Sequence, residues 1–260
     1  MENKLEILFL GTCAADFSPK LKDEFKDSFD LDARRSSSML IDGKYLVDCG
    51  PHTLDSLRIA GIDRECISHV FMTHLHSDHF CPDNVEALAK ERKSPLYLWI
   101  REDAPIVELD NVIIKRIPIF KEEKAEDGVT VTGLLANHEA SSYPLHLLIK
   151  IGEKQIFYGC DGGWLINQTY EYLKRKEVHM AVLDCTVGDY LGDYRIVEHN
   201  CIPMLRVMLP SLLTEKIITN YTKVIFSHIA PSLHKPHKET VKTVEEMGAI
   251  LAYDGMKLEI

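Results

Sequence analysis

Metal-binding side chains are concentrated in one short stretch of the sequence. Residues 73–80 read THLHSDHF and place three histidines and one aspartate within six positions. They follow directly on the apolar residues 70–72, where a short buried strand is expected to end. A buried segment tolerates imidazole and carboxylate groups only when these groups have partners. We therefore interpret the stretch as a metal site.

The spacing inside this stretch suggests how metal ions would be held. In an extended segment residues i and i+2 point to the same side, so His74 and His76 could bind one cation together. A turn after His76 would direct Asp78 and His79 toward a second cation. Imidazole combined with carboxylate suits zinc, iron, manganese, nickel or copper, so the residue types do not name the metal. Two ions about 3.5–4 Å apart need further ligands, ideally including a bridging carboxylate.

Further candidate ligands stand directly after other apolar runs. His138 follows residues 133–137, Asp161 follows residues 155–160 and precedes two glycines, and His228 follows residues 224–227. A lone histidine after a strand is more often a hydrogen-bonded structural residue. The dense cluster at residues 74–79 favours the metal-ligand interpretation for these positions.

The elements that must position these residues alternate along the chain. Strands are predicted at residues 4–10, 38–41, 45–47, 70–72, 96–100, 112–119, 129–136, 145–151, 155–158, 181–183 and 223–226. Helices are predicted at residues 51–60, 83–90, 167–174, 202–209 and 238–247. Hairpins are expected at Asp42-Gly43, at residues 152–154 and at Asp254-Gly255, where residues 249–260 would close the chain. The order favours α/β layers, and we expect one domain over residues 1–260.

Composition narrows the classes of function. The formal net charge is −10, which argues against nonspecific nucleic-acid binding through a broad basic surface. No apolar run approaches the roughly 20 residues that span a bilayer. The first residues carry Glu2 and Glu6 rather than the basic start of an export signal, so we expect a cytoplasmic protein. The seven cysteines include no C-x-x-C pair, so they are interpreted as buried thiols.

One charged segment interrupts the regular pattern. Residues 17–35 read FSPKLKDEFKDSFDLDARR and include three phenylalanines. The segment could be a solvated loop or a flap that covers a site, because long loops in compact domains are often functional. Arg35, at its end, could meet a phosphate on the substrate side of such a flap.

The sequence resembles the metallo-β-lactamase-fold hydrolases, whose signature is H-x-H-x-D-H. The segments LGT, LVDCG, NHE, YGCDG and FSH occur in the family's order over essentially the whole chain. The resemblance implies an α/β fold, an αββα sandwich with a two-metal site at one edge between its sheets. It further implies the ligands: one metal would be held by His74, His76 and His138, the other by Asp78, His79 and His228, and Asp161 would bridge them.

Within that family the closest resemblance is to the PhnP-like phosphodiesterases, which are accessory enzymes of phosphonate breakdown. The segments VLDCT at 182–186, VEHN at 197–200 and YDGMKLEI at the end of the chain carry this resemblance. It implies that His199 acts on the phosphate or the leaving group. A cysteine-rich loop that holds a structural zinc in that branch has no counterpart here. His234 would match the histidine of that zinc site, and we expect it to contact substrate instead.

These residues predict a two-metal hydrolase that acts on a small or cyclic phosphate ester. A metal-bridging water with a lowered pKa would supply hydroxide as the nucleophile, and His199 would be the acid or a phosphate-binding group. Asp48, in LVDCG, would contact a ligand histidine and fix its tautomer. An alternative is a carboxylic ester, lactone or thioester hydrolase on the same site. A non-hydrolytic metal-binding or redox protein is less favoured, and the fold would also allow a homodimer.

Overall fold

Two sheets form the centre of the computed structural model, which describes residues 4–90, 92–105, 108–125 and 127–260. In the described residues each sheet has 7 strands. In chain order, the first sheet contains β1 (Glu6–Gly11), β2 (Ser38–Ile41), β3 (Tyr45–Val47), β4 (His69–Phe71), β5 (Leu96–Arg101), β6 (Val112–Ile117) and β14 (Lys257–Glu259). The second contains β7 (Glu122–Lys124), β8 (Thr130–Leu135), β9 (Leu145–Ile151), β10 (Lys154–Gly159), β11 (Met180–Asp184), β12 (Lys223–Ser227) and β13 (Ile250–Leu251).

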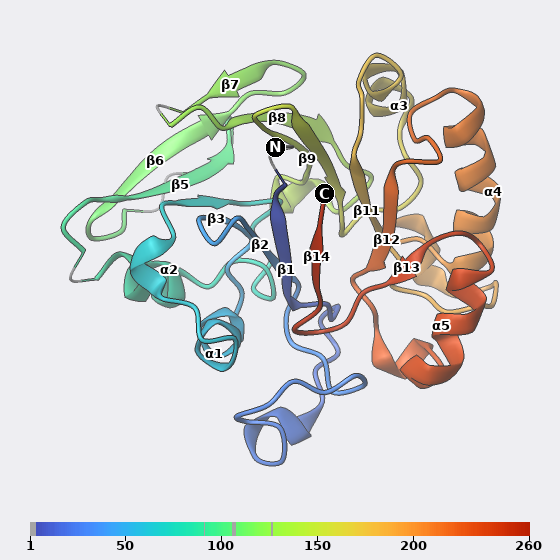
Figure 1. Ribbon diagram of the computed structural model, residues 1–260, viewed down its shortest axis with the longest axis horizontal. Coiled ribbons are helices and arrows are strands. Elements are labelled where there is room, and N and C mark those ends of the chain that lie inside the picture. Colours follow the sequence, from blue (N-terminus) through green and yellow to red (C-terminus); the bar gives the residue numbers. More distant parts are fainter. Residues whose placement is uncertain (1–3, 91, 106–107, 126) are drawn as a thin grey trace.

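Helices cover the outer face of each sheet, as Figure 1 shows. The first sheet is covered by α1 (Thr53–Ile59) and α2 (Pro82–Ala89), on the left of the view. The second is covered by α3 (Asn167–Leu173), α4 (Ile202–Thr214) and α5 (His237–Glu245), on the right. The predicted αββα sandwich is therefore confirmed.

Side-chain alternation along the strands explains these layers. In β11, Met180 and Val182 lie in the core between the two sheets, whereas Ala181 and Leu183 lie in the core beneath the helices. Successive side chains of a strand point to opposite faces, so a strand that is covered on both sides must be apolar throughout. This is why the strand that ends at Asp184 reads as a continuous apolar run before its one carboxylate.

The strand directions bring chemistry-bearing residues to one edge of the sandwich. In the first sheet β3 and β4 are parallel. In the second, β10, β11 and β12 are parallel to one another. The carboxyl ends of these strands therefore lie side by side within each sheet, and the loops that follow them can meet between the sheets.

The predicted closing hairpin at residues 249–260 is wrong. β13 pairs with β12 in the second sheet, whereas β14 pairs antiparallel with β1 in the first. The connection passes from one sheet to the other, and it is held where the Ala252 N–H donates to the Phe226 carbonyl and the Gly255 N–H donates to the Phe9 carbonyl. Asp254-Gly255 thus lies in a connection that leads from the second sheet to the first. The Asp-Gly turn signal in the sequence does not distinguish such a connection from a hairpin.

One helix is longer than predicted, and one strand is missing from the prediction. α4 runs on to Thr214 and contains Pro210, whereas the predicted helix ends at residue 209. The three residues of β7 are all charged and exposed, so no strand is predicted there. β7 pairs with β8 at the edge of its sheet, where charged side chains are typical.

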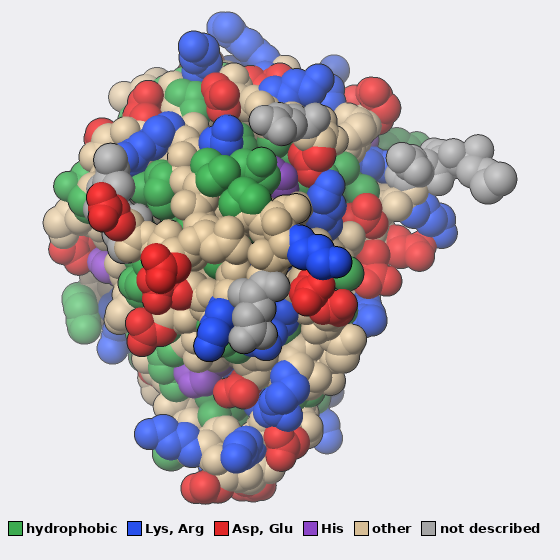
Figure 2. All heavy atoms as spheres, turned by 90° about the vertical axis from the view of Figure 1, so that its left-hand side faces the viewer, with side chains coloured by type: hydrophobic (Ala, Val, Ile, Leu, Met, Phe, Trp, Pro, Cys, Tyr) green, Lys and Arg blue, Asp and Glu red, His purple; other side chains and the backbone are tan. Residues whose placement is uncertain are grey.

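The face of the molecule shown in Figure 2 carries side chains of both charges. On the face that carries α1 and α2, acidic and basic side chains are interspersed rather than sorted by sign. Nonspecific nucleic-acid binding uses clustered lysine and arginine, which the described part of this face does not present. Among the described residues, none of the helices has the length and apolar character needed to cross a membrane.

Candidate metal centre

The predicted ligands all stand beyond the carboxyl ends of strands, and the structure brings them together. His74, His76, Asp78 and His79 follow β4, His138 follows β8, Asp161 follows β10, and His228 follows β12. These strands belong to both sheets, so the cluster joins the two halves of the sandwich at one edge.

Sharp turns in the backbone direct these side chains inward. Asp48, Asp161 and His228 have φ angles of 60°, 55° and 58°, in the left-handed region that residues with a Cβ rarely adopt. Each of these residues stands one or two positions after the end of a buried strand, so the chain turns sharply at the edge of the sheet. Gly162 continues the turn at Asp161, and a Cβ at this glycine would lie 2.5 Å from the Cε1 atom of the buried His146 ring.

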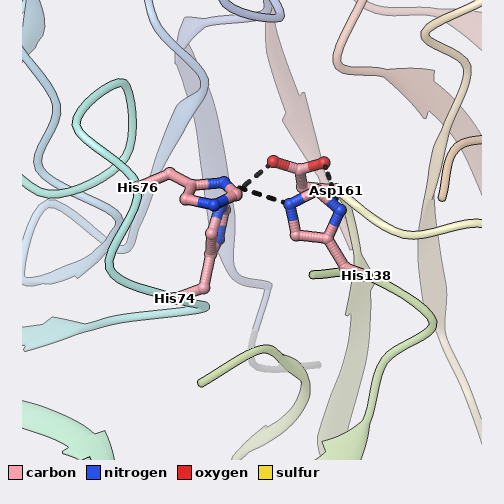
Figure 3. A group of neighbouring side chains, drawn as sticks. All are labelled: His74, His76, His138 and Asp161. Atoms are coloured by element: carbon pink, nitrogen blue, oxygen red, sulfur yellow. Dashed lines mark hydrogen bonds and ion pairs between the residues drawn. The ribbon is translucent and has the colours of Figure 1, made fainter. Parts of the chain in front are cut away.

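One group of ligand atoms surrounds the first expected metal position (Figure 3). His74 Nε2 lies 3.1 Å from Asp161 Oδ2, and His138 Nδ1 lies 3.6 Å from Asp161 Oδ1. His76 Nδ1 lies 3.1 Å from His138 Nε2. One ligand atom from each of these four residues lies within 4.8 Å of the others.

A second group shares Asp161 with the first. His79 Nε2 lies 3.2 Å from Asp161 Oδ2 and 3.1 Å from His228 Nε2. Asp78 Oδ2 lies 3.4 Å from the same His79 nitrogen. These four residues again offer one ligand atom each within 4.8 Å of one another. The shared position of Asp161 is what a bridging ligand requires.

Hydrogen bonds on the outer side of the rings fix which nitrogen carries a lone pair. A carboxylate can only accept, so the Nδ1–H of His79 donates to Asp48 over 2.8 Å and the Nδ1–H of His228 donates to Asp184 over 3.1 Å. The Nε2 atoms of both rings therefore point into the centre, where they face each other at 3.1 Å. Two nitrogens at this distance need a proton or a metal cation between or beside them.

His74 is oriented in the same way through a threonine. The hydroxyl of Thr73 donates to Asp48, and it lies 2.9 Å from His74 Nδ1, from which it accepts a hydrogen bond. The lone pair of His74 is therefore on Nε2, which is buried and has no hydrogen-bond partner. His138 Nδ1 and Asp161 Oδ1 are likewise buried without such a partner. The donor set of imidazoles and carboxylates thus fits divalent transition-metal ions.

The charge balance of the cluster agrees with this fit. Burial would raise the pKa of Asp161, but His228 and His74 beside it hold that pKa well below its usual range. Burial lowers the pKa of His138 to about 4, so this ring is neutral at neutral pH. Burial would also lower the pKa of His79, but Asp48 and Asp161 raise it well above its usual range. A proton on His79 therefore occupies the place that a bound metal ion would take.

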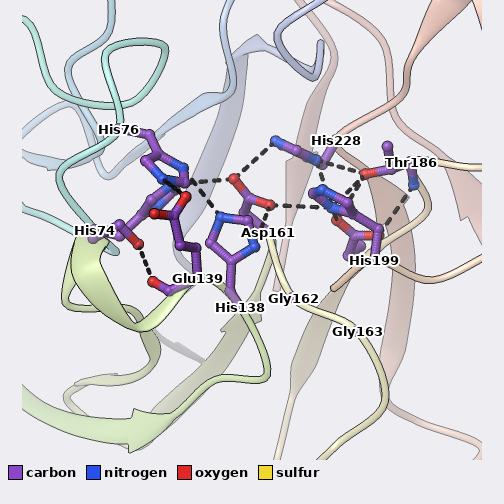
Figure 4. A network of polar contacts seen from close by, with 12 residues as sticks. His74, His76, His138, Glu139, Asp161, Gly162, Gly163, Thr186, His199 and His228 are labelled. Atoms are coloured by element: carbon purple, nitrogen blue, oxygen red, sulfur yellow. Dashed lines mark hydrogen bonds and ion pairs between the residues drawn. The ribbon is translucent and has the colours of Figure 1, made fainter. Parts of the chain in front are cut away.

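His199 lies at the rim of this cluster, as Figure 4 shows. Its Nδ1 is 3.2 Å from Asp161 Oδ1 and 3.2 Å from Asp184 Oδ2, and its ring stacks on His228 at 5.6 Å between centroids. Burial would lower the pKa of His199, but the hydrogen bond and the charge of Asp184 raise it to about 9. The imidazole is therefore protonated at neutral pH.

Asp184 is a site residue that sequence reasoning missed. Its carboxylate is fully buried and contacts His199, His228 and the hydroxyl of Thr186, and it also accepts the Asn200 N–H over 2.8 Å. The available signal was its position, because it ends a buried strand as the other site carboxylates do. In the sequence the segment VLDCT carries only a family resemblance, which predicts no function for its aspartate.

Two predicted substrate contacts are not brought to the cluster. Arg35 is 1% exposed, and its guanidinium donates to the carbonyls of Ser28 and Phe25 and lies over the Phe29 ring. It therefore holds residues 17–35 together, in the lobe that projects at the bottom of Figure 1. His234 Nε2–H donates to the Cys185 carbonyl over 2.8 Å, and this ring lines neighbouring cavities rather than the metal cavity.

A cavity of about 370 Å³ opens onto the ligand cluster. Asp161, His199 and His228 line it on the metal side, and Arg195 and Leu233 contribute to the remaining wall. The size suits a small ligand that reaches the metal positions directly. Arg195 belongs to the short 3-10 helix Tyr194–Val197, and its carbonyl accepts the His199 N–H over 2.9 Å, so the two residues stand one turn apart.

Comparison with known proteins identifies the family. A family model described as the metallo-beta-lactamase superfamily matches residues 31–165, just over half of the 260 residues. The chain belongs to the metallo-β-lactamase superfamily. Its members are mostly metal-dependent hydrolases, and two metal ions in one site are typical of them. The comparison with curated proteins gives no match.

Solved structures with the superfamily fold cover almost the whole chain. A diphosphatase of the PhnP family shares 19% identity, with 99% of this chain and 97% of that chain covered and a TM-score of 0.71. The fold protein YhfI from Bacillus subtilis shares 12% identity, with both chains covered to 100% and a TM-score of 0.75. Zinc-bound PqqB from Methylobacterium extorquens shares 15% identity, with 98% and 100% covered and a TM-score of 0.70. At these identities the likeness shows the shared fold.

Proposed function

We propose that the protein is a phosphodiesterase that acts on a small or cyclic phosphate ester at a site of two divalent metal ions. The observation that carries the proposal is the position of His199 at the rim of the ligand cluster, where its Nδ1 lies 3.2 Å from Asp184. The hydrogen bond and the charge of Asp184 raise the pKa of His199 to about 9. An alkoxide that leaves a phosphate ester needs a proton, and a cationic imidazole at this rim can provide it. The metal ligands would be His74, His76 and His138 for one ion, Asp78, His79 and His228 for the other, and Asp161 between them.

Bound metal ions would supply Lewis-acid stabilisation of the phosphoryl charge and a water of lowered pKa. The chain's own residues would orient the metal ligands, hold the proton donor and contact the phosphate. Asp48 and Thr73 keep His79 and His74 in the tautomers that present Nε2 to the centre. Asp184 holds His199 protonated and fixes its ring. Arg195 could contact a phosphate oxygen through guanidinium N–H groups that its bond to Asp193 leaves free.

The comparisons support phosphate-ester chemistry as a class. The solved structures with this fold include the PhnP-family diphosphatase and the short form of human tRNase Z, and both names describe enzymes that act on phosphate linkages. A small substrate fits the cavity of about 370 Å³ better than an RNA does. The net charge of −10 also favours a small ligand over a nucleic acid.

Metal analysis and a substrate panel test this proposal. The purified protein would be analysed for bound metals, loaded with Zn²⁺ or Mn²⁺, and assayed with bis-p-nitrophenyl phosphate, a lactone and a thioester. We expect about two metal ions per chain and turnover of the phosphodiester. His199→Ala should lose about 10²–10⁴-fold with an ester whose leaving group is an alkoxide, and much less with p-nitrophenolate as the leaving group. His179→Ala is the matched control, because His179 lies at the start of β11, away from the site.

The same panel separates the competing functions. Turnover of the lactone or the thioester, but not of the phosphodiester, would assign the site to acyl-ester hydrolysis. Two bound metals without turnover of any ester would favour a non-hydrolytic metal protein. A protein that binds no Zn²⁺, Mn²⁺, Fe²⁺ or Ni²⁺ would refute the two-metal site itself.

A further inference from the structure

A second, larger cavity adjoins the metal cavity. Its volume is about 750 Å³, and it lies between α5 and the segment of residues 188–202. Ser232 and Leu233, from the 3-10 helix Pro231–Leu233, line both cavities. The two spaces therefore lie on either side of one short turn, and a ligand that enters the metal cavity can extend across this turn.

One closed loop serves both cavities. The Val187 N–H donates to the Asn200 carbonyl over 3.0 Å, and the Ile202 N–H donates to the Gly188 carbonyl over 3.3 Å, so the loop is tied at its base. A Cβ on Gly188 would lie only 2.3 Å from the Leu233 carbonyl oxygen, which shows how closely this base packs on the shared turn. The loop places His199 in the metal cavity and Tyr190 in the larger one.

Two lysines and two acids line the larger cavity. Lys235 and Lys242 make no ion pair with any residue in the described ranges. Of the two acids, Asp189 faces Arg206 at 3.6 Å, and Glu239 makes no ion pair within the same ranges. Two ammonium groups against one unpaired carboxylate leave a net positive charge, which on a chain with a net charge of −10 is a local site for an anion.

An aromatic ring stands beside these cations. Tyr190 is 40% exposed although it is a large apolar side chain, and its backbone is held by a 3.0 Å hydrogen bond from its N–H to the Gly188 carbonyl. An exposed ring on a backbone held in this way offers a stacking surface for a planar group. Ring and ammonium groups together match a ligand that carries both an aromatic ring and negative charge.

We propose that this larger cavity binds the arm of the substrate that remains attached to phosphorus, and that this arm is nucleotide-like, with an aromatic base and a second anionic group. The inference rests on the proposed phosphodiesterase function for the orientation of the substrate. The reacting phosphorus would lie at the metal ligands, the arm would cross Ser232 and Leu233, and its base would stack on Tyr190. Lys235 and Lys242 would face its second anion.

Binding to the metal-loaded protein tests the cavity without any turnover. Isothermal titration would compare adenosine 5′-diphosphate with inorganic pyrophosphate, which has no ring, and with adenosine 5′-monophosphate, which has one phosphate. We expect the diphosphate to bind about tenfold more tightly than pyrophosphate. Tyr190→Ala should abolish this advantage, and Lys242→Ala should weaken diphosphate binding about threefold. Lys238→Ala, an exposed lysine of the same helix outside the cavity, should change nothing.

Equal affinity for the diphosphate and pyrophosphate, or equal effects of Lys242→Ala and Lys238→Ala, would overturn the inference. Turnover of methyl p-nitrophenyl phosphate by the same variants provides the second readout. Tyr190→Ala and Lys242→Ala should retain at least half of wild-type turnover, because only a methyl group stays attached to phosphorus in that substrate. If the wild type fails to hydrolyse it while the binding pattern holds, the proposed function falls and the cavity assignment stands.

Discussion

Replacement of Asp184 by asparagine should alter both the metal site and the pH profile. In the wild type, Oδ1 of Asp184 accepts two backbone N–H groups, from Thr186 at 3.1 Å and Asn200 at 2.8 Å, so the amide oxygen of asparagine would take this place. Its NH₂ group would then face the Nδ1 atoms of His228 and His199. An NH₂ group donates, so it would favour the tautomer of His228 that carries its proton on Nε2, the atom expected to bind metal.

The size of both effects follows from the contacts. Loss of a partner that orients a ligand histidine typically lowers metal affinity by about 10–100-fold, and only the ion bound by His228 should be affected. His199 would also lose the charge that raises its pKa to about 9. With a pKa of about 9 it is about 90% protonated at pH 8, whereas at an ordinary value of about 6.5 it would be about 3% protonated.

The raised pKa favours the protonated form, so the wild type should keep its proton donor up to about pH 9 and lose activity above it. The Asp184→Asn variant should lose about 30-fold in kcat/KM at pH 8 and less than about twofold at pH 6, when metal is saturating. Stepwise metal titration and a kcat/KM profile from pH 5.5 to 9.5 would measure both effects. Asp189→Asn, an exposed acid in the same loop, is the control. A uniform loss at every pH with unchanged metal affinity would refute the assigned action of Asp184.

Three further predictions concern metal removal and the chain that supports the site. Chelation should lower the melting temperature by about 5–10 °C, because a metal present at about 100 times its Kd contributes about 2.7 kcal/mol to stability. Re-addition of metal should restore the melting temperature. An unchanged melting curve would contradict the fit of the ligand set. Gly50→Ala should destabilise the fold by about 1–3 kcal/mol in urea titrations and displace Asp78, because the new Cβ would lie 1.9 Å from the Asp78 carbonyl oxygen. A variant with wild-type stability and wild-type metal content would count against this. In Arg35→Ala, protease should cleave residues 17–33 about tenfold faster, because the lobe loses the hydrogen bonds to the Ser28 and Phe25 carbonyls. Mass spectrometry would measure the cleavage. An unchanged rate would argue against Arg35 as the anchor of the lobe.

Much of the fold could be predicted because its strands are short apolar runs with clear ends. The strand ends at β4, β10 and β12 mark the candidate ligands that follow them, and the family resemblance implies their assignment to two metals. The candidate ligands His74, His76 and His79 also have distinctive residue types and spacing. Such local signals can be recognised in the sequence alone, because each depends on a few neighbouring residues.

The missed features depend on distant pairing. The connection at Asp254 looks like a hairpin locally, yet its flanking strands join different sheets. Arg35 looks like a phosphate ligand, and only the packing of Phe25 and Phe29 around it shows that it is an internal anchor. Asp184 has no neighbouring histidine in sequence, and its partners His199 and His228 come from other segments. No pattern within a few residues reports these contacts, although the position of Asp184 at the end of a buried strand marks it as a candidate.

The backbone conformations at the site give a physical reason for its two-sheet construction. Asp48, Asp161 and His228 adopt left-handed conformations, each of which costs about 1–2 kcal/mol for a residue with a Cβ. Asp48 ends a strand of one sheet, and the other two residues end strands of the second. These turns direct side chains from both sheets to one point, and they persist because the sheets on either side fix the positions of the strand ends. The same rigidity sets the Nε2 atoms of His79 and His228 toward each other before any metal binds, so the binding energy of the metal need not order the ligands.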